Sequence, residues 1–142
     1  MNFKAIALAS LAALVAAAPT NEQPVNETAP VSKRSDDTYN NIATWYNAET
    51  GNRGACGDWL SNNDRFVAVS YDNPIPCGQW VGFNVNGVTS YGKVVDKCPS
   101  CAWNHYDMSL ALFQDFDQLY KGEIYDIWSW HVDSWVDPST LF

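Results

Sequence analysis

The sequence predicts a small, mainly β domain that closes into a barrel and carries one or two short helices. Short segments rich in β-branched and aromatic residues recur, Gly, Pro and Asn separate them, and only one segment has helical spacing. The chain has 142 residues, with seven tryptophans and seven tyrosines. This aromatic content is typical of a folded domain and excludes a wholly disordered chain.

The expected elements are short strands and a single helix. Asn86-Gly87 is a tight-turn signal that joins two strands into a hairpin. The helix is expected over 108–120, where apolar residues are three and four apart, with Ser109 near its start and Gly122 as its stop. A closed barrel would also remove exposed strand edges. The expected strands are 42–46, 65–70, 80–85, 88–96 and 124–130.

The first 34 residues have the pattern of processing segments. Residues 1–18 combine Lys4, a short apolar run and three alanines, as in a secretory signal peptide, and the run is too short to span a membrane. Residues 19–34 are polar, contain three prolines and end in the dibasic pair Lys33-Arg34, which is typical of a pro-segment. The alternative for this pair is an exposed charge pair in a linker. We therefore expect a secreted, extracellular domain over 35–142.

The charge balance narrows the possible partners. The net charge is −8, and removal of residues 1–34 would leave five basic and fourteen acidic side chains, a net charge of −9 (5 − 14). A nucleic-acid partner is not expected, because phosphate binding needs a basic surface. We expect a monomer with no membrane contact after processing. Anionic wall polymers such as pectin would be repelled, so neutral glucans, xylans or chitin are easier targets.

Four cysteines lie in the expected mature domain, and secretion favours disulfides. Four cysteines allow three pairings, of which we favour Cys56–Cys77 with Cys98–Cys101. The first would close a loop of about 20 residues. Two alternatives for the second pair are a redox-active dithiol and half of a zinc site completed by His105 and His131. An oxidising compartment argues against zinc, so no metal and no cofactor is expected.

Five short motifs follow one another over 42–130. They are Thr44-Trp45-Tyr46, Gly54-Ala55-Cys56-Gly57, Cys77-Gly78, Val94-Val95-Asp96-Lys97-Cys98-Pro99 and His105-Tyr106-Asp107-Met108-Ser109. In these motifs and their order the chain resembles the expansins and their relatives, whose fold is a six-stranded double-psi β-barrel. It is most similar to the single-domain fungal loosenins, because no second, carbohydrate-binding domain follows; rare-lipoprotein-A-like barrels and barwin are more distant.

The resemblance implies roles for single residues. Asp107 stands where expansins and family 45 endoglucanases have their acid, and Asp96 stands at the second aspartate of the groove. Thr44 and Tyr46 match the polar positions of the first strand. The barwin-like cysteine pattern also supports the Cys56–Cys77 pairing. The catalytic base of family 45 is missing, because no acid follows the first-strand aromatics before Glu49.

The two aspartates suggest carbohydrate chemistry. Glycoside inversion needs an acid and a base that flank the scissile bond. If Asp96 and Asp107 share one groove, proximity and burial would raise the pKa of one of them, which suits Asp107 as an acid or hydrogen-bond donor. The alternatives are structural: Asp96 could hold a loop at a strand end, and Asp107 could favour a helix N-terminus.

Trp103 and Trp59 are the candidate platforms for sugar rings, although aromatic residues are more often core. His105 is expected to support the site by hydrogen bonding. The function expected is the binding and non-hydrolytic loosening of cell-wall polysaccharide. The alternatives are a glycoside-cleaving enzyme, such as a family-45-like endoglucanase or lytic transglycosylase, and a protein-binding barrel, such as a cysteine-protease inhibitor or effector.

Overall fold

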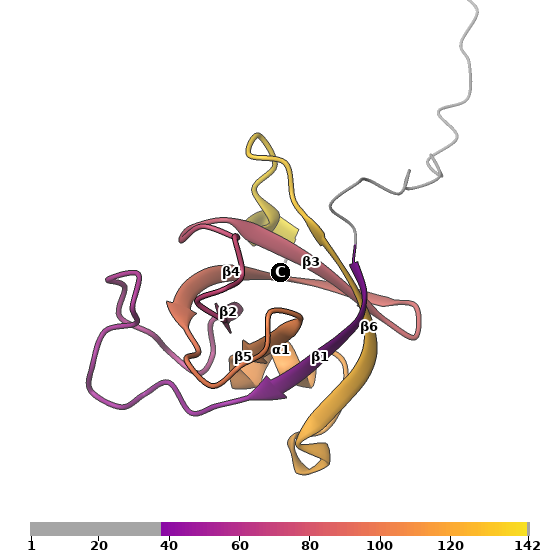
Figure 1. Ribbon diagram of the computed structural model, residues 1–142, viewed down its shortest axis with the longest axis horizontal. Helices are drawn as coiled ribbons and strands as arrows, with labels where there is room; N and C mark the ends of the chain where they lie inside the picture. The colour runs from indigo at the N-terminus through magenta and orange to yellow at the C-terminus, as the bar shows by residue number, and fades with distance from the viewer. Residues whose placement is uncertain (1–37, 142) are drawn as a thin grey trace, which may run out of the picture. The chain divides into compact units, whose positions relative to one another are not determined.

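A computed structural model describes residues 38–141, which form a six-stranded barrel (Figure 1). The predicted signal peptide (1–18) and pro-segment (19–34) lie outside the described residues. Within the described part, no helix is both long and apolar enough to cross a membrane. The strands are β1 (Thr38–Trp45), β2 (Phe66–Val69), β3 (Trp80–Val85), β4 (Val88–Lys97), β5 (His105–Met108) and β6 (Glu123–His131); α1 (Leu110–Gln114) is the α-helix, and η1 (Leu119–Lys121) and η2 (Pro138–Leu141) are 3₁₀ turns.

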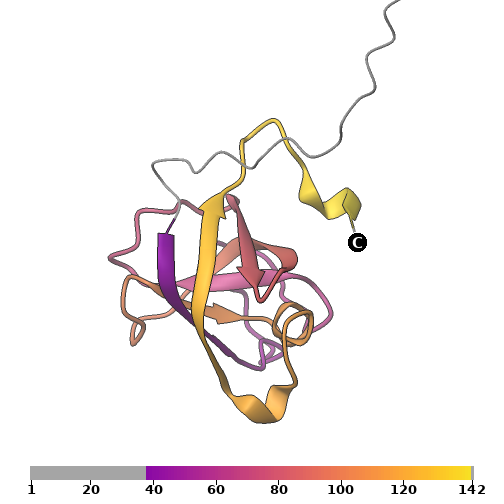
Figure 2. The same ribbon diagram turned by 90° about the vertical axis from the view of Figure 1, so that its right-hand side faces the viewer.

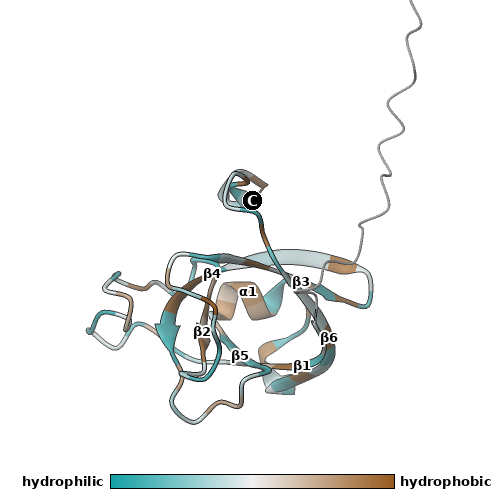
Figure 3. Ribbon diagram, turned by 45° about the horizontal axis from the view of Figure 1, so that its top comes forward, coloured by the Kyte–Doolittle hydropathy of each residue, from teal (hydrophilic) through white to brown (hydrophobic). Residues whose placement is uncertain are grey.

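The strands follow one another around the barrel in the order β1-β5-β2-β4-β3-β6, and β6 pairs with β1 to close it (Figure 3). The pairs β1–β5 and β2–β4 are parallel, and the other four pairs are antiparallel. Figure 2 shows β1 and β6 side by side. The predicted closed β-barrel is confirmed.

Alternation along the strands fills the interior. On β2, Val67 and Val69 are fully buried in the core, and on β5 Tyr106 and Met108 alternate with half-buried neighbours. The helix α1 lies within the ring of strands when viewed as in Figure 3, and its Leu112 and Phe113 belong to the same core. Because successive side chains point to opposite faces of a strand, His105 and Asp107 of β5 point to the outer face and are partly exposed.

The hairpin prediction is confirmed. Asn86 and Gly87 link β3 to β4, and both have positive φ angles, of 51° and 88°. These angles fit a turn that follows the twist of the strands. Within β3, Gly82 packs against the indole of Trp130, and a Cβ added at this position would clash with that ring. Trp130 can approach the backbone of β3 this closely because the position is glycine.

The helix prediction over 108–120 is wrong in extent. The α-helix covers only Leu110–Gln114, and Met108 ends the strand β5, which the sequence analysis did not predict. The Asp115 N–H bonds Leu112, and its side chain accepts two hydrogen bonds from Arg65 and one from Ser90. Asp115, the C-cap residue, is thus bound to Arg65 and to Ser90 of β4 at the point where the helix ends. The expected capping by Ser109 is confirmed: its hydroxyl accepts from the Leu112 N–H.

Both favoured disulfides are present. Cys56 pairs with Cys77 and Cys98 pairs with Cys101. The first joins the long β1–β2 loop to the segment before β3, and the second closes the short β4–β5 connection. With the sulfurs paired, neither thiolate is free for zinc, so the alternative zinc site with His105 and His131 is wrong.

Candidate functional site

Strand register places the two candidate acids in one row. Across β1, β5, β2 and β4, Thr44 is opposite Asp107, Asp107 is opposite Ala68, and Ala68 is opposite Asp96. Since neighbouring strands are about 4.8 Å apart, the backbones of the two aspartates are separated by roughly 10 Å. Four neighbouring strands of the barrel therefore bring the acids to one outer face. We call this set of residues the acid row (Thr44, Asp107, Ala68 and Asp96).

A bulge in β4 turns Asp96 toward this face. In the pairing with β2, Val94 is opposite Val67 and Asp96 is opposite Ala68, so Val95 is the extra residue, which has no partner on β2. Val94 belongs to the barrel core, whereas Val95 packs in a second cluster with Phe66. Bulges redirect side chains in this way, and they are common beside functional sites.

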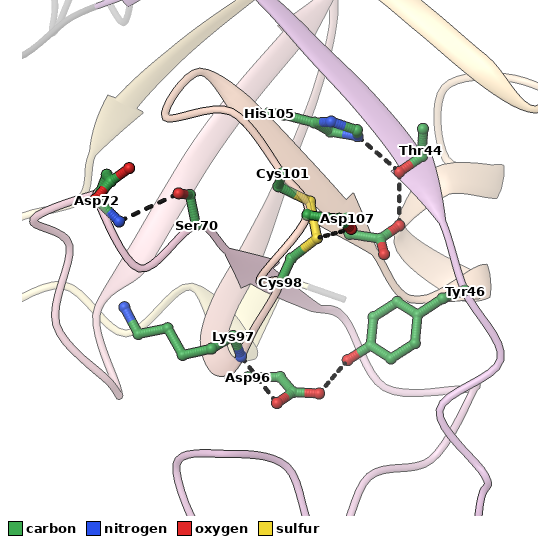
Figure 4. The surroundings of a disulfide bond; sticks show 11 residues. Thr44, Tyr46, Ser70, Asp72, Asp96, Lys97, Cys98, Cys101, His105 and Asp107 are labelled. Atoms are coloured by element: carbon green, nitrogen blue, oxygen red, sulfur yellow. Dashed lines mark hydrogen bonds between the residues drawn. A yellow bond between two sulfur atoms is a disulfide. The ribbon is translucent and has the colours of Figure 1, made fainter.

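Asp107 is held by its neighbour on β1 (Figure 4). Thr44 Oγ1 donates to Asp107 Oδ1 at 2.6 Å, and the same hydroxyl lies 2.8 Å from His105 Nε2. A hydroxyl has one hydrogen, so when Thr44 donates to Asp107 it can only accept from His105. With Thr44 donating to Asp107, the arrangement requires the form of His105 that carries hydrogen on Nε2.

The pKa of Asp107 is raised above its ordinary value of 3.8. Burial is the largest cause, and the nearby charge of Asp96 adds to it. The Thr44 hydrogen bond and His105 act in the opposite direction without cancelling the shift. A carboxyl that holds its proton to higher pH is suited to donate a hydrogen bond or a proton at mildly acidic pH.

Asp96 is used differently from Asp107. Its Oδ1 accepts from the backbone N–H of Ala55 at 2.7 Å and of Lys97 at 2.8 Å, and its Oδ2 accepts from the Tyr46 hydroxyl at 2.9 Å. Burial and the charge of Asp96 together raise the pKa of Tyr46, so its phenol stays protonated as the donor. The carboxylate ties the β1–β2 loop to β4, which is the structural role that the sequence left open.

Glu49, the first acid after the β1 aromatics, is also engaged in structure. Its Oε1 accepts from the Ser61 hydroxyl at 3.1 Å and from the Asn62 N–H at 3.0 Å. These bonds fold the β1–β2 loop onto itself. In the described part of the chain, one oxygen of Glu49 and both oxygens of Asp96 already accept hydrogen bonds from the protein.

The disulfide Cys98–Cys101 lies beside Asp107 (Figure 4). The two sulfurs and a carboxylate oxygen of Asp107 are within 4.8 Å of one another. Such a cluster could hold a metal ion only with free thiolates, and both sulfurs are in the disulfide. The disulfide instead limits the movement of the β4–β5 loop next to the acid.

The two candidate platforms lie in different places. Trp103 is 57% exposed in the β4–β5 loop, two residues before His105, and its carbonyl accepts from the Asn73 side chain at 2.8 Å. Trp59 is 64% exposed in the β1–β2 loop and lines a cavity of about 470 Å³ that includes no member of the acid row. The structure therefore brings together Thr44, Tyr46, Asp96, His105 and Asp107, with Trp103 on the adjoining loop, but not Trp59.

Two contributions to the site were missed by the sequence analysis. Ala68 separates the acids, and its small side chain is almost fully buried between them. The backbone N–H of Ala55 fixes Asp96. An alanine and a backbone amide carry no chemical signature in a sequence, so only the register and the loop path could reveal them.

No family model and no curated protein sequence matches the chain. Among solved structures, a Streptomyces papain inhibitor is 27% identical with a TM-score of 0.59, over 70% of this chain and 96% of the inhibitor. An expansin of Clavibacter michiganensis, solved as a point variant in complex with cellohexaose, is 25% identical with a TM-score of 0.61, over 72% of this chain. The same expansin solved without a ligand is also 25% identical to this chain, with a TM-score of 0.60.

The match covers 53% of the expansin, so this chain spans about half of that protein's length. Neither relative is a fungal protein, and the likeness to fungal loosenins stays a prediction. Three findings agree on the fold. The barrel has six strands as expected, two of its strand pairs are parallel, and the chain is similar to both solved structures. The chain has the double-psi β-barrel fold of the expansins, which the papain inhibitor shares.

Proposed function

We propose that this protein is a secreted, expansin-like protein that binds a neutral cell-wall polysaccharide along the acid row and loosens it without cleaving it. One observation carries the proposal. Asp107 has a raised pKa, whereas the opposing carboxylate, Asp96, already accepts three hydrogen bonds. The site therefore pairs an acid, Asp107, with a carboxylate, Asp96, that is bound to the β1–β2 loop.

Binding is supported by the chemistry of the outer face. Thr44, His105 and Asp107 present polar groups in one place, and the exposed ring of Trp103 lies on the adjoining loop. Sugar rings pack their C–H surface on aromatic faces while their hydroxyls bond polar groups. The net charge of −8 favours a neutral polysaccharide over an anionic one. The expansin in complex with cellohexaose supports the same ligand class.

Loosening would follow from hydrogen-bond exchange. A protonated Asp107 can donate to a hydroxyl or glycosidic oxygen of a bound chain, in competition with the bonds that hold neighbouring chains together. Hydrolysis needs a second carboxylate that activates water on the opposite side of the bond. Asp96 is committed to Ala55, Lys97 and Tyr46, so cleavage is not expected.

Binding is tested by depletion of the 35–142 domain from solution by insoluble cellulose, chitin and xylan. We expect at least one polymer to deplete the wild-type domain, and Asp107→Asn to weaken that depletion. Asp126→Asn is the matched control: it makes the same charge change at an exposed position of β6, and Asn tolerates the positive φ of 59° there. Equal depletion of all three proteins would remove Asp107 from binding.

A second candidate function is supported by the papain inhibitor, whose match covers 96% of its chain. In this reading the barrel presents loops to a papain-like protease. Tyr71 is 67% exposed on the loop after β2, and the Asn73–Trp103 hydrogen bond ties this loop to the one that carries Trp103. A papain assay tests it: inhibition by the wild type that is lost in Trp103→Ala would favour the protease partner, and no inhibition would exclude papain as a target.

A further inference from the structure

A cavity of about 470 Å³ lies outside the acid row, on the outer face of the barrel between the β1–β2 loop and β4. Its volume is in the range of small-ligand sites. The apolar part of its wall is Trp59 and Leu60 from the loop, Phe66 from β2, Trp80 from β3 and Val95 from β4. Ser139 of η2 also lines it, so the C-terminal segment beyond β6 contributes to this wall.

The ring of Trp59 is positioned before any ligand arrives. Arg53 and Trp59 form an antiparallel bridge, and the Gly54 N–H donates to the Asp58 carbonyl at 2.9 Å. The Arg53 guanidinium lies 4.9 Å from the ring centroid and also donates to the Gly57 carbonyl. One face of the indole is thus covered by Arg53, yet the residue stays 64% exposed. A fixed, open aromatic face loses little conformational freedom on binding.

The charges of the cavity are balanced. Asp58 and Asp64 line it together with Arg65 and Lys93. Arg65 is already paired with Asp115 through two hydrogen bonds at 2.7 and 2.8 Å. An anionic ligand would meet two carboxylates and a protein of net charge −8, so this wall fits a neutral ligand with many hydroxyls.

We propose that the Trp59–Trp80 cavity is a second saccharide subsite, which takes a neutral pyranose unit of the polysaccharide on the aromatic face of Trp59. The inference rests on the proposed function, since it adds a subsite to the same polysaccharide-binding protein. The β1–β2 loop contributes to both places: Ala55 fixes Asp96 of the acid row, and Asp58, Trp59 and Leu60 line the cavity. The polysaccharide would therefore contact the protein on two surfaces joined by this loop.

The test is an NMR titration of the 35–142 domain with cellohexaose, chitohexaose and xylohexaose in turn. We expect one of them to shift the side-chain indole N–H signals of Trp59 and Trp80. In Trp59→Ala its affinity should fall roughly tenfold or more, as for the truncation of a central tryptophan in an interface. Trp59→Phe should retain part of the affinity. The matched control is Trp135→Ala, which removes an 82% exposed tryptophan outside the cavity and should change nothing.

The outcomes separate this inference from the proposed function. Shifts at Thr44 and Asp107 without shifts at Trp59 and Trp80 would overturn the second subsite and leave the proposed function standing. Equal affinities of Trp59→Ala and wild type would overturn the second subsite as well. No shift anywhere with any of the three hexasaccharides would overturn both.

Discussion

The hydroxyl of Thr44 donates a 2.6 Å hydrogen bond to Asp107 across the parallel pair of β1 and β5. This bond stabilises the carboxylate, whereas burial stabilises the protonated form, and burial is the larger effect on the pKa of Asp107. Thr44 thus limits how far the pKa rises and holds the carboxyl in place.

Replacing Thr44 with valine, which has nearly the same shape but no hydroxyl, should raise the pKa of Asp107 further. The reason is that the bond favouring the charged form is removed while burial remains. A carboxyl-carbon NMR titration of Asp107 measures this directly. Thr44→Ser keeps the hydroxyl and should leave the pKa near its wild-type position. A pKa that falls in Thr44→Val would show that Thr44 does not stabilise the carboxylate.

Asp107→Asn should stabilise the domain at neutral pH. Because the folded-state pKa is raised, the native state binds the proton more tightly than the unfolded state, and stability falls as pH rises from the ordinary pKa of 3.8 through the folded value. The asparagine lacks this penalty and keeps an oxygen that can accept from Thr44. Urea unfolding at pH 7 should show the variant as the more stable protein, and the advantage should vanish at pH values below 3.8. A variant less stable than the wild type at pH 7 would contradict the sign of the shift.

Asp96→Ala should destabilise the fold more than Asp107→Ala. Loss of Asp96 leaves the N–H groups of Ala55 and Lys97 and the Tyr46 hydroxyl without their acceptor, at an expected cost of about 1–3 kcal/mol in the free energy of unfolding. Asp107 accepts from Thr44, whose hydroxyl can donate to His105 Nε2 instead once the imidazole changes to its other tautomer. Urea midpoints of both variants, at one pH and with the same m-value, measure the difference. Equal midpoints would mean that the β1–β2 loop does not depend on Asp96.

The two disulfides should differ in what they support: one mainly the stability of the fold, the other mainly polysaccharide binding. The Cys56–Cys77 bond has a sequence separation of 21, so its removal should cost about 3 kcal/mol in the chain-entropy model. The Cys98–Cys101 bond spans a separation of 3 and should cost about 2 kcal/mol or less. Removal of Cys98–Cys101 should nevertheless weaken polysaccharide binding more than removal of Cys56–Cys77, because the Cys98–Cys101 bond lies beside Asp107. Paired serine variants, compared by thermal unfolding and by depletion on the best polymer, check this order; the reverse order would contradict it.

The barrel could be predicted because its signals are local. The β-rich segment of β2, the partial alternation in β3, the Asn86-Gly87 turn and the order of the short motifs can all be read in a single sequence. The strand β5 was missed because it has only four residues and runs directly into α1. The predicted helix was too long because apolar residues remain three and four apart after Gln114. In the structure that segment is a turn followed by the 3₁₀ helix η1.

The site was only partly predictable. Its acids, Asp96 and Asp107, were found, but the difference between them was not. It depends on the bulge at Val95 and on the path of the loop that places Ala55 over Asp96, both of which are non-local. The sequence predicts Trp59 as a candidate platform without placing it, and the structure shows that it lines a cavity separate from the acid row. The neighbours of an aromatic residue in a loop are set by tertiary packing, which the sequence does not show.

Loosening without cleavage can be measured by the tensile strength of cellulose filter paper incubated with the 35–142 domain, with soluble reducing sugars measured in the same sample. We expect the paper to weaken without release of reducing ends, and we expect Asp107→Asn to abolish the weakening while Asp126→Asn retains it. Weakening accompanied by reducing ends that depend on Asp107 would instead make the protein a hydrolase.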